Sequence, residues 1–388
     1  MFKKLLTQLH WLLGITAGTV LAVMGVTGAL MSFEDEVLHA LNTRVVTVAP
    51  QAAALPLPEL IDKVQSAQPG KRVSQLQVFA VPDRALRVTL VPKKTADNSK
   101  GQRRRGEVRY VNPYSAELLG DKELRGQSAL QTIERIHRGM VAGDIGRAVV
   151  GASAITLAVL ALSGLYLRWP RSGKLQWRTW FKIHSTLKGR PFLWNLHAVV
   201  GTYVLPVYLL SSLTGLYFAY DWYRQGVIAT VGATPPNRDP PKLDAPADAT
   251  NLAQIWTAFR QASGNFASAT LILPQTRQHA FEIRYLPVGV RHERAFDRMV
   301  LHPSTAQVLK HERYVNKNAG NKLIASIFPL HSGQYFGLAG RVAVMLTSLC
   351  MPLFALTGWL MYLKRRRAAQ RTRLPDPQSG AVTASNLA

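Results

Sequence analysis

Five histidines lie near the ends of long apolar stretches, where imidazole side chains are suited to bind a metal or a haem iron. His10 and His197 each begin such a stretch, and His137 and His331 each precede one after a glycine-containing turn. His184 lies in the basic segment before His197. Cys350 is the single cysteine, so the chain cannot form an internal disulfide, a CxxC redox pair or a cysteine-ligated iron–sulfur cluster. If this protein carries electrons through a metal centre, we expect histidine ligands.

The elements that must position these histidines are four apolar stretches, each long enough to cross a bilayer core, which takes about 20 helical residues. None contains a charged residue before its edge, and they are Trp11–Phe33, Ala148–Trp169, Ala198–Tyr220 and Val342–Tyr362. The first stretch is longer than the apolar region of a signal peptide and has no small-residue cleavage site after it. We therefore predict four membrane spans, the first of them uncleaved.

Lysine and arginine in the short flanking segments predict the orientation of the spans. These residues crowd into the N-terminus, the loop between the second and third spans and the tail after the fourth, which the positive-inside rule places in the cytoplasm. The two long segments are then outside. The predicted division is a first span at 1–33, an outer domain with an interfacial helix carrying His137 at 34–146, a second span at 147–169, a cytoplasmic loop at 170–196, a third span at 197–220, an outer domain carrying His331 at 221–340, a fourth span at 341–363 and a basic cytoplasmic tail at 364–388.

The formal net charge of +25 raises the question of a nucleic-acid partner. The basic residues crowd beside the apolar stretches, however, where they act as topology signals and contact anionic lipid headgroups. We predict anionic membrane lipids, and no nucleic acid, as partners.

The chain also has no GxGxxG, Walker, HExxH or GxSxG motif, so no recognisable nicotinamide site, ATPase site or hydrolase site is present.

The sequence contains an internal duplication. The first set of matches has an offset of 187 residues: Leu9-His10, Gly14 and Thr27-Gly28 correspond to Leu196-His197, Gly201 and Thr214-Gly215. The second set has an offset of 194 residues: His137, Gly139, Gly146-Arg147 and Ser163-Gly164 correspond to His331, Gly333, Gly340-Arg341 and Thr357-Gly358. Each half runs helix, outer domain, helix, which is a parallel repeat. Each outer domain has a helical pattern, at Leu57–Ala67 and Leu252–Ser263, followed by three alternating strands. The predicted fold is an α-helical bundle of four transmembrane helices with two small α+β domains.

The duplication also pairs the histidines. Small residues share the helical face of His10 (Gly14, Gly25 and Gly28) and that of His197 (Gly201, Ser212 and Gly215). Such faces leave room for a flat macrocycle between two helices, although plain helix packing is an alternative explanation. A haem with two imidazole ligands needs one from each side, so symmetry pairs His10 with His197 and His137 with His331. These four histidines are the predicted ligands of two haem irons.

Three points about the predicted sites stay open. His184 is an alternative ligand on the cytoplasmic side. Arg147 and Arg341, at equivalent positions of the repeat, either pair with haem propionates or anchor helix ends at the headgroups. The remaining histidines are predicted to be ordinary surface residues of the outer domains, and they are His39, His279, His292, His302 and His311.

The repeated unit resembles a known family. It runs His-x-x-x-Gly, span, Thr-Gly, a module ending Val-Asn-Pro-Tyr-Ser-Ala-Glu-Leu-Leu-Gly, then His-x-Gly and a span ending Gly-Leu-Tyr-Leu-Arg-Trp-Pro-Arg. This is similar to the PepSY-associated transmembrane family of iron-regulated inner-membrane proteins of Gram-negative bacteria, and the layout resembles FoxB-type ferrisiderophore reductases. Where the family has Tyr-x-Asp-Pro, this chain has Asn112 before Pro113 and His302 before Pro303. That departure argues against a metal or peptide role at these two positions.

The resemblance implies two haems b and reduction of a ferric siderophore in the periplasm, which releases Fe(II). It also implies a bacterial inner-membrane location with both termini in the cytoplasm. The electron donor is then a cytoplasmic protein or a quinol. Two alternatives remain: a PepSY-type regulatory membrane protein that binds a peptide or partner without redox activity, and a component of a siderophore or haem permease. The absence of charged residues inside the spans disfavours the permease.

Overall fold

The computed structural model describes residues 1–93, 106–170, 177–234 and 241–371. The chain divides into two compact units. The helix unit comprises Met1–Ser32, Thr132–Arg224 and the chain from Arg341 onward, and the sheet unit comprises Phe33–Gln131 and Gln225–Gly340. Part of the predicted cytoplasmic loop, 171–176, and most of the predicted tail, 372–388, lie outside the described residues.

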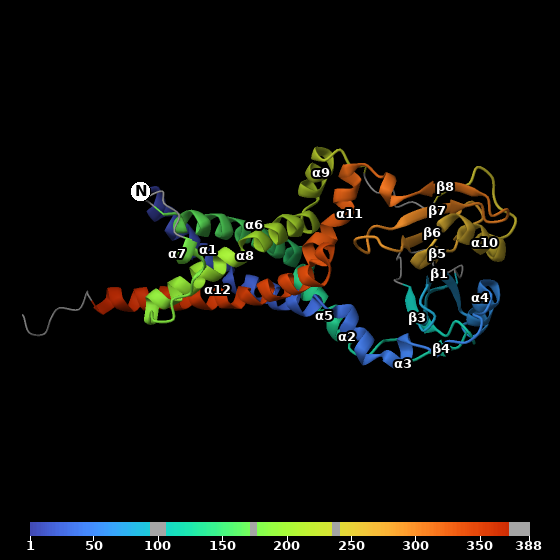
Figure 1. Cartoon of the computed structure of the whole chain (residues 1–388), viewed down its shortest axis with the longest axis horizontal. Helices are drawn as coiled ribbons and strands as arrows, with labels where there is room; N and C mark the ends of the chain where they lie inside the picture. The colour runs from blue at the N-terminus through green and yellow to red at the C-terminus, as the bar shows by residue number, and fades with distance from the viewer. Residues whose placement is uncertain (94–105, 171–176, 235–240, 372–388) are drawn as a thin grey trace, which may run out of the picture. The chain divides into compact units, whose positions relative to one another are not determined.

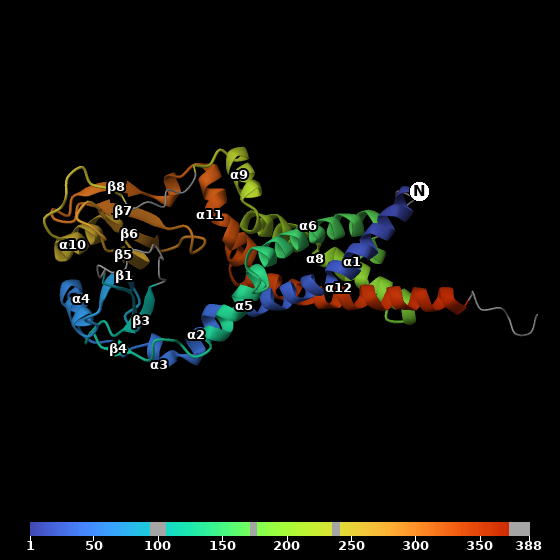
Figure 2. The ribbon, with the colours of Figure 1, turned by 180° about the vertical axis from the view of Figure 1, so that it is seen from behind.

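Four long helices run side by side in the helix unit (Figures 1 and 2). They are α1 (Phe2–Met31), α6 (Gly143–Arg168), α8 (Gly189–Ala219) and α12 (Gly337–Arg371). Each is long and apolar enough to cross a membrane, which confirms the four predicted spans. The helices extend past the predicted apolar stretches because helical hydrogen bonding continues through their polar flanks. His10 therefore lies inside α1 and His197 inside α8 rather than at a helix end.

Small residues let these helices approach closely. A side chain at Gly25 of α1 would collide with Ser348 and Met351 of α12, and one at Gly18 would touch Ala355 at 3.6 Å. Gly25 therefore serves plain helix packing, the alternative explanation of the small-residue face. Nothing lies within 4 Å of the position that a Cβ atom of Gly14 would occupy, so this glycine leaves open space beside His10.

The repeated glycines that follow His137 and His331 form a tight connection to the next long helix. His137 lies on α5 (Gln127–Gly139), and the carbonyl group of Gly139 occupies the place where Gly146 of α6 would carry its Cβ atom. In the second half, the Gly333 carbonyl group stands in the same relation to Gly340. Only glycine permits this contact, which explains why both pairs recur with the same spacing.

The sheet unit contains one eight-stranded antiparallel sheet in the order β4-β3-β2-β1-β5-β6-β7-β8. The strands are β1 (Lys71–Phe79), β2 (Leu86–Pro92), β3 (Glu107–Val111), β4 (Leu118–Leu119), β5 (Phe266–Ile272), β6 (Phe281–Pro287), β7 (Asp297–Leu301) and β8 (Val308–Glu312). Each half of the duplication supplies four strands. The halves join where β1 pairs with β5, with Leu76 opposite Leu271. The expectation of two separate small domains is therefore corrected to two modules that share a sheet.

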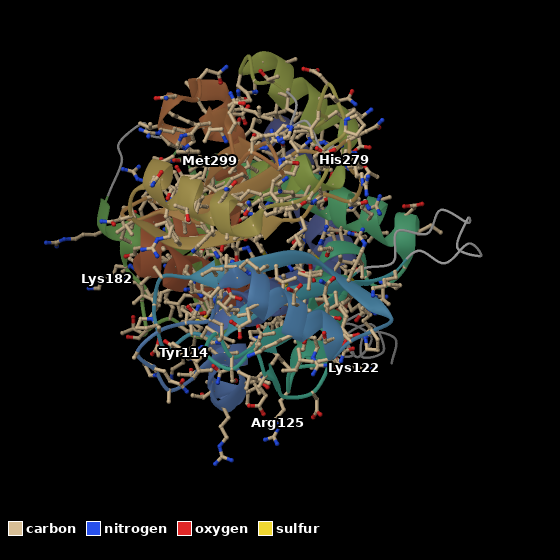
Figure 3. All side chains as sticks on the ribbon, turned by 90° about the vertical axis from the view of Figure 1, so that its right-hand side faces the viewer. Tyr114, Lys122, Arg125, Lys182, His279 and Met299 are labelled. Atoms are coloured by element: carbon tan, nitrogen blue, oxygen red, sulfur yellow. The ribbon has the colours of Figure 1, made fainter. Side chains whose placement is uncertain are left out.

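One hydrophobic core lies between this sheet and two helices, α4 (Leu57–Ser66) and α10 (Leu252–Ser263). Leu60 and Val64 of α4 and Phe259 of α10 are almost fully buried in it. Met299 of β7, labelled in Figure 3, is also fully buried there. The core explains why both sequence modules begin with an amphipathic helix, since each helix covers the strands of its own half.

The remaining helices connect these parts. They are α2 (Glu34–Leu41), α3 (Thr43–Val46), α7 (Trp177–Phe181), α9 (Asp221–Thr230), η1 (Tyr314–Asn316), α11 (Ala319–Ser332), which carries His331, and η2 (Gln334–Phe336).

The two positions that depart from the family's Tyr-x-Asp-Pro motif form turns. Asn112 Oδ1 accepts a hydrogen bond from the Tyr114 amide at 2.9 Å, and His302 Nδ1 accepts one from the Ser304 amide at 3.3 Å. An aspartate carboxylate would accept the same bond. Both residues therefore have a structural role as turn acceptors.

Candidate functional site

His10 and His197 come together between α1 and α8. Their ring centres are 6.4 Å apart and their planes are inclined by 70°. Two imidazoles on opposite sides of one metal ion, each bonded to it at about 2 Å, have ring centres roughly 6 Å apart. The spacing of this pair is therefore that of two ligands of one metal centre.

A cavity of about 340 Å³ adjoins both rings. Its volume lies within the range of roughly 300–1,000 Å³ that ligand pockets occupy. The glycines of the sequence motifs form part of its wall, including Gly14, Gly164 and Gly201. Among the described residues, no group of three or more His, Cys, Asp or Glu side chains is arranged to hold a bare metal ion. Two imidazoles suffice for a haem, because the macrocycle supplies the other four nitrogen ligands. The donor set fits a haem.

Each histidine of this pair forms a hydrogen bond with a hydroxyl group of another helix. His10 Nδ1 lies 2.8 Å from Ser163 Oγ of α6, and His197 Nδ1 lies 2.7 Å from Thr357 Oγ1 of α12. Ser163 and Thr357 occupy equivalent positions of the repeat, so the two contacts are symmetry-related. Both blocks recur in the repeat, but no sequence pattern connects them with the histidines.

Two arginines at the same cavity were also missed as candidate site residues. Arg190 and Arg365 line it and are exposed, whereas sequence reasoning treated such residues only as topology signals. Arg168 lines the cavity too, but its guanidinium group donates to the carbonyl groups of Ala198, Thr179 and Trp180. Arg168 therefore holds the chain after α6 against α8, while Arg190 and Arg365 are placed to meet an anionic group at the cavity.

His184, the alternative ligand, does not line this cavity. It borders a neighbouring cavity of about 770 Å³, and its backbone amide donates to Asn195 Oδ1 at 2.8 Å. The two cavities share Arg168, Arg190, Trp194 and Met361. His184 thus lies beside a site that adjoins the histidine pair, and His10 is the residue whose ring faces His197.

His137 is held against α1. Its Nδ1 lies 3.0 Å from Thr27 Oγ1, and its Cε1 lies 3.1 Å from the position that a Cβ atom of Gly28 would occupy. Burial lowers the pKa of His137, and a hydrogen bond with the Met24 backbone acts in the opposite direction. A neutral imidazole is the form that binds iron. His331 lies near the end of α11 in the sheet unit, and its pairing with His137 stays a prediction.

Arg147 and Arg341 have different surroundings. Arg147 forms an exposed ion pair with Asp144 at 3.3 Å. Arg341 donates from Nε and Nη2 to the carbonyl oxygen of Ser32, at 3.1 and 2.8 Å, and so anchors the C-terminal end of α1. A role of either residue toward a haem propionate stays a prediction.

The other histidines differ in their surroundings, whereas the sequence predicted surface positions for all of them. His292 is 6% exposed and lies 3.1 Å from Ser326 Oγ, so its assignment to the surface was wrong. His311 Nε2 lies 2.8 Å from Tyr285 Oη, and His302 is the turn acceptor described above. Amphipathic periodicity does not identify a buried histidine in a loop between strands, and none of these residues lines either cavity.

The family model for the PepSY-associated TM region matches residues 7–365. A search of curated proteins finds no match to this chain. The family match spans both histidine-bearing halves and both units.

Proposed function

The chain belongs to the PepSY-associated TM region family of membrane proteins, and from this we propose a di-haem protein that carries single electrons across the membrane to a ferric siderophore. The observation that carries the proposal is the His10–His197 pair, with ring centres 6.4 Å apart beside a 340 Å³ cavity. In this proposal His10 and His197 would hold one haem b, and His137 and His331 would hold the second.

A bound haem supplies a one-electron Fe(III)/Fe(II) couple. The residues of the chain bind it and set its surroundings. The helices around the His10–His197 cavity would enclose the macrocycle, and Arg190 and Arg365 would pair with its propionates. Arg147 and Arg341 are proposed for the propionates of the second haem. Two centres are needed because a hydrocarbon core of roughly 30 Å is too wide for one fast electron transfer.

The substrate reaction balances with one electron for each ferric chelate. Fe(III) in the siderophore is reduced to Fe(II), which the siderophore holds weakly and releases. A quinol donor gives two electrons and two protons, so it reduces two chelates, and a cytoplasmic protein donor supplies the same electrons. We place both termini in the cytoplasm and the sheet unit in the periplasm of a bacterial inner membrane, from the distribution of Lys and Arg. The 770 Å³ cavity beside the His10–His197 pair is the proposed docking site of the donor.

The first experiment is a visible spectrum of the full-length protein purified in detergent. We expect a Soret band, split α and β bands after reduction with dithionite, and two haems per chain. The reduced protein should be reoxidised when a ferric siderophore is added, and a ferrous chelator should trap one Fe(II) per electron. A protein without a Soret band would overturn the proposal and favour the regulatory, partner-binding alternative.

A ligand variant then tests the second haem. His137→Ala should lose one of two redox transitions and should reduce ferric siderophore far more slowly, while the transition of the His10–His197 haem remains. Two unchanged transitions would refute His137 as a ligand. Uptake of intact labelled chelate into proteoliposomes without Fe(II) formation would instead identify a permease.

A further inference from the structure

Three buried hydroxyl groups repeat one contact with three of the histidines. Ser163, Thr357 and Thr27 are between 3% and 6% exposed. Each oxygen lies within hydrogen-bond distance of the Nδ1 atom of one ring: Ser163 at 2.8 Å from His10, Thr357 at 2.7 Å from His197 and Thr27 at 3.0 Å from His137. In each contact the ring atom is Nδ1, and the His137 ring also forms a hydrogen bond with the Met24 backbone.

The direction of these hydrogen bonds follows from the hydrogens available. A hydroxyl group has one hydrogen to donate and two lone pairs to accept with. Thr357 Oγ1 donates to the Leu353 carbonyl oxygen at 2.8 Å, and Thr27 Oγ1 donates to that of Val23 at 2.8 Å. Ser163 Oγ donates to the Leu160 carbonyl oxygen at 3.2 Å. Such bonds to the preceding helical turn are the usual contacts of serine and threonine within a helix.

A hydroxyl group that gives its hydrogen to its own helix can only accept from the imidazole. The ring must then carry its hydrogen on Nδ1. A neutral imidazole protonated on Nδ1 has its lone pair on Nε2, and a lone pair is what a metal ligand needs. The hydrogen bond also makes the ring a stronger electron donor and fixes its orientation.

We propose that Ser163, Thr357 and Thr27 are positioning residues that hold His10, His197 and His137 in the Nδ1-protonated tautomer, so that each ring presents the lone pair of Nε2 to iron. The assignment of iron rests on the proposed function, whereas the tautomer does not. The recurring Ser/Thr-Gly dipeptide is then the part of the repeat that supports a histidine.

The glycine of the dipeptide completes the support at two of the three positions. A Cβ atom at Gly164 would lie 3.3 Å from His10 Cε1, and one at Gly28 would lie 3.1 Å from His137 Cε1. Both distances are shorter than ordinary van der Waals contact, so the hydroxyl-bearing residue and the glycine after it fit the ring as a unit. At Gly358 nothing lies within 4 Å, and there Thr357 acts alone.

Valine in place of Thr357 removes the hydroxyl group and keeps the shape of the side chain. We expect Thr357→Val to bind haemin about 10–100-fold more weakly at the His10–His197 site than the wild type, the usual effect of losing a partner of a ligating histidine. The midpoint potential of that haem should rise, because a less basic ligand stabilises Fe(III) less. Ser163→Ala should act in the same direction, and Thr357→Ser should restore the wild-type values.

Thr347→Val is the matched control. Thr347 lies on the same helix and donates to its own helix at 2.8 Å, to the Ala343 carbonyl oxygen, as Thr357 does to Leu353. No hydrogen bond joins its hydroxyl group to any of the three rings, so its replacement should change neither haemin affinity nor potential. If Thr357→Val and Ser163→Ala behave like this control, the proposal is overturned while a haem-loaded wild type leaves the proposed function standing.

A measurement on the wild type does not depend on any variant folding. Nitrogen-15 spectra of haem-free full-length protein labelled in its histidines should show His10, His197 and His137 protonated on Nδ1. Protonation on Nε2 would overturn the proposal. If the wild type takes up no haemin at all, the proposed function fails, and the nitrogen-15 spectra still decide the tautomer.

Discussion

The two copies of the duplicated unit meet in different ways in the two parts of the molecule. In the sheet unit they join through the backbone, where β1 pairs with β5, and one hydrophobic core contains residues of both halves. In the helix unit the copies leave a 340 Å³ cavity, and His10 and His197 face each other across the join.

The difference reflects what each element must satisfy. A strand edge has unpaired amide and carbonyl groups, and pairing β1 with β5 satisfies them. A membrane helix already satisfies its own backbone groups, so its packing needs only side chains and tolerates a gap. The sheet join is therefore suited to stability, and the helix join is suited to holding a ligand.

The largest expected effect is at the helix join. His10→Ala or His197→Ala should abolish the bis-histidine spectrum of one of the two proposed haems, because its iron would keep one protein ligand and no opposing imidazole. His184→Ala is the control and should keep both haems, since His184 borders the neighbouring cavity. The measurement is haem content per chain with the reduced spectrum. Loss of a haem in the His184 variant alone would reassign the ligand and weaken the contrast between the joins.

A smaller effect is expected when the sheet join loses packing. Leu271 is fully buried opposite Leu76, so Leu271→Ala should lower the stability of the sheet unit by about 2–5 kcal/mol. Hydrogen exchange of the strand amides in the full-length protein measures this opening. Leu309→Ala, at a 46% exposed position of β8, should change it by less than about 0.5 kcal/mol. The haem spectrum should stay the same in both variants, and a parallel loss of haem would contradict the separation of the two joins.

The smallest effect concerns charge in the sheet unit. The Glu282 side chain is 5% exposed and accepts hydrogen bonds from Arg284 and Arg298. Burial acts to raise the pKa of Glu282, but the two arginines outweigh it and hold the pKa below its usual value. A depressed folded pKa stabilises the fold above the unfolded pKa, and this contribution is lost as pH falls through the folded pKa.

Glu282→Gln should therefore lower the free energy of unfolding of the sheet unit by about 1–3 kcal/mol near pH 7. The difference in unfolding free energy between variant and wild type should shrink below about pH 4.5. Strand-amide exchange at several pH values measures it. Glu59→Gln is the control, because Glu59 forms an exposed ion pair with Lys63, of a kind that contributes about 0–1 kcal/mol. If Glu282→Gln and Glu59→Gln lower the unfolding free energy equally, burial of Glu282 does not strengthen its ion pairs.

Sequence patterns predicted much of this architecture. Hydropathy identified the four long helices, and helical periodicity predicted Leu252–Ser263 with the bounds that α10 has. The duplication predicted that His10 and His197 would lie near each other. Two features were not predictable from local patterns: the β1–β5 pairing, and the burial of His292, which depends on contacts with α11.

The sequence by itself determined the number of spans, the repeat and the exclusion of an internal disulfide, because each follows from residue type and order. Only the tertiary structure decided which small residues pack helices and which leave space: Gly25 contacts α12, and Gly14 borders the cavity. It also decided the hydroxyl partners of the histidines. Ser163 is 153 residues from His10 and Thr357 is 160 residues from His197, so the contacts exist only where α6 and α12 pack against α1 and α8. The repeat preserved both members of each pair, and packing alone brought them together.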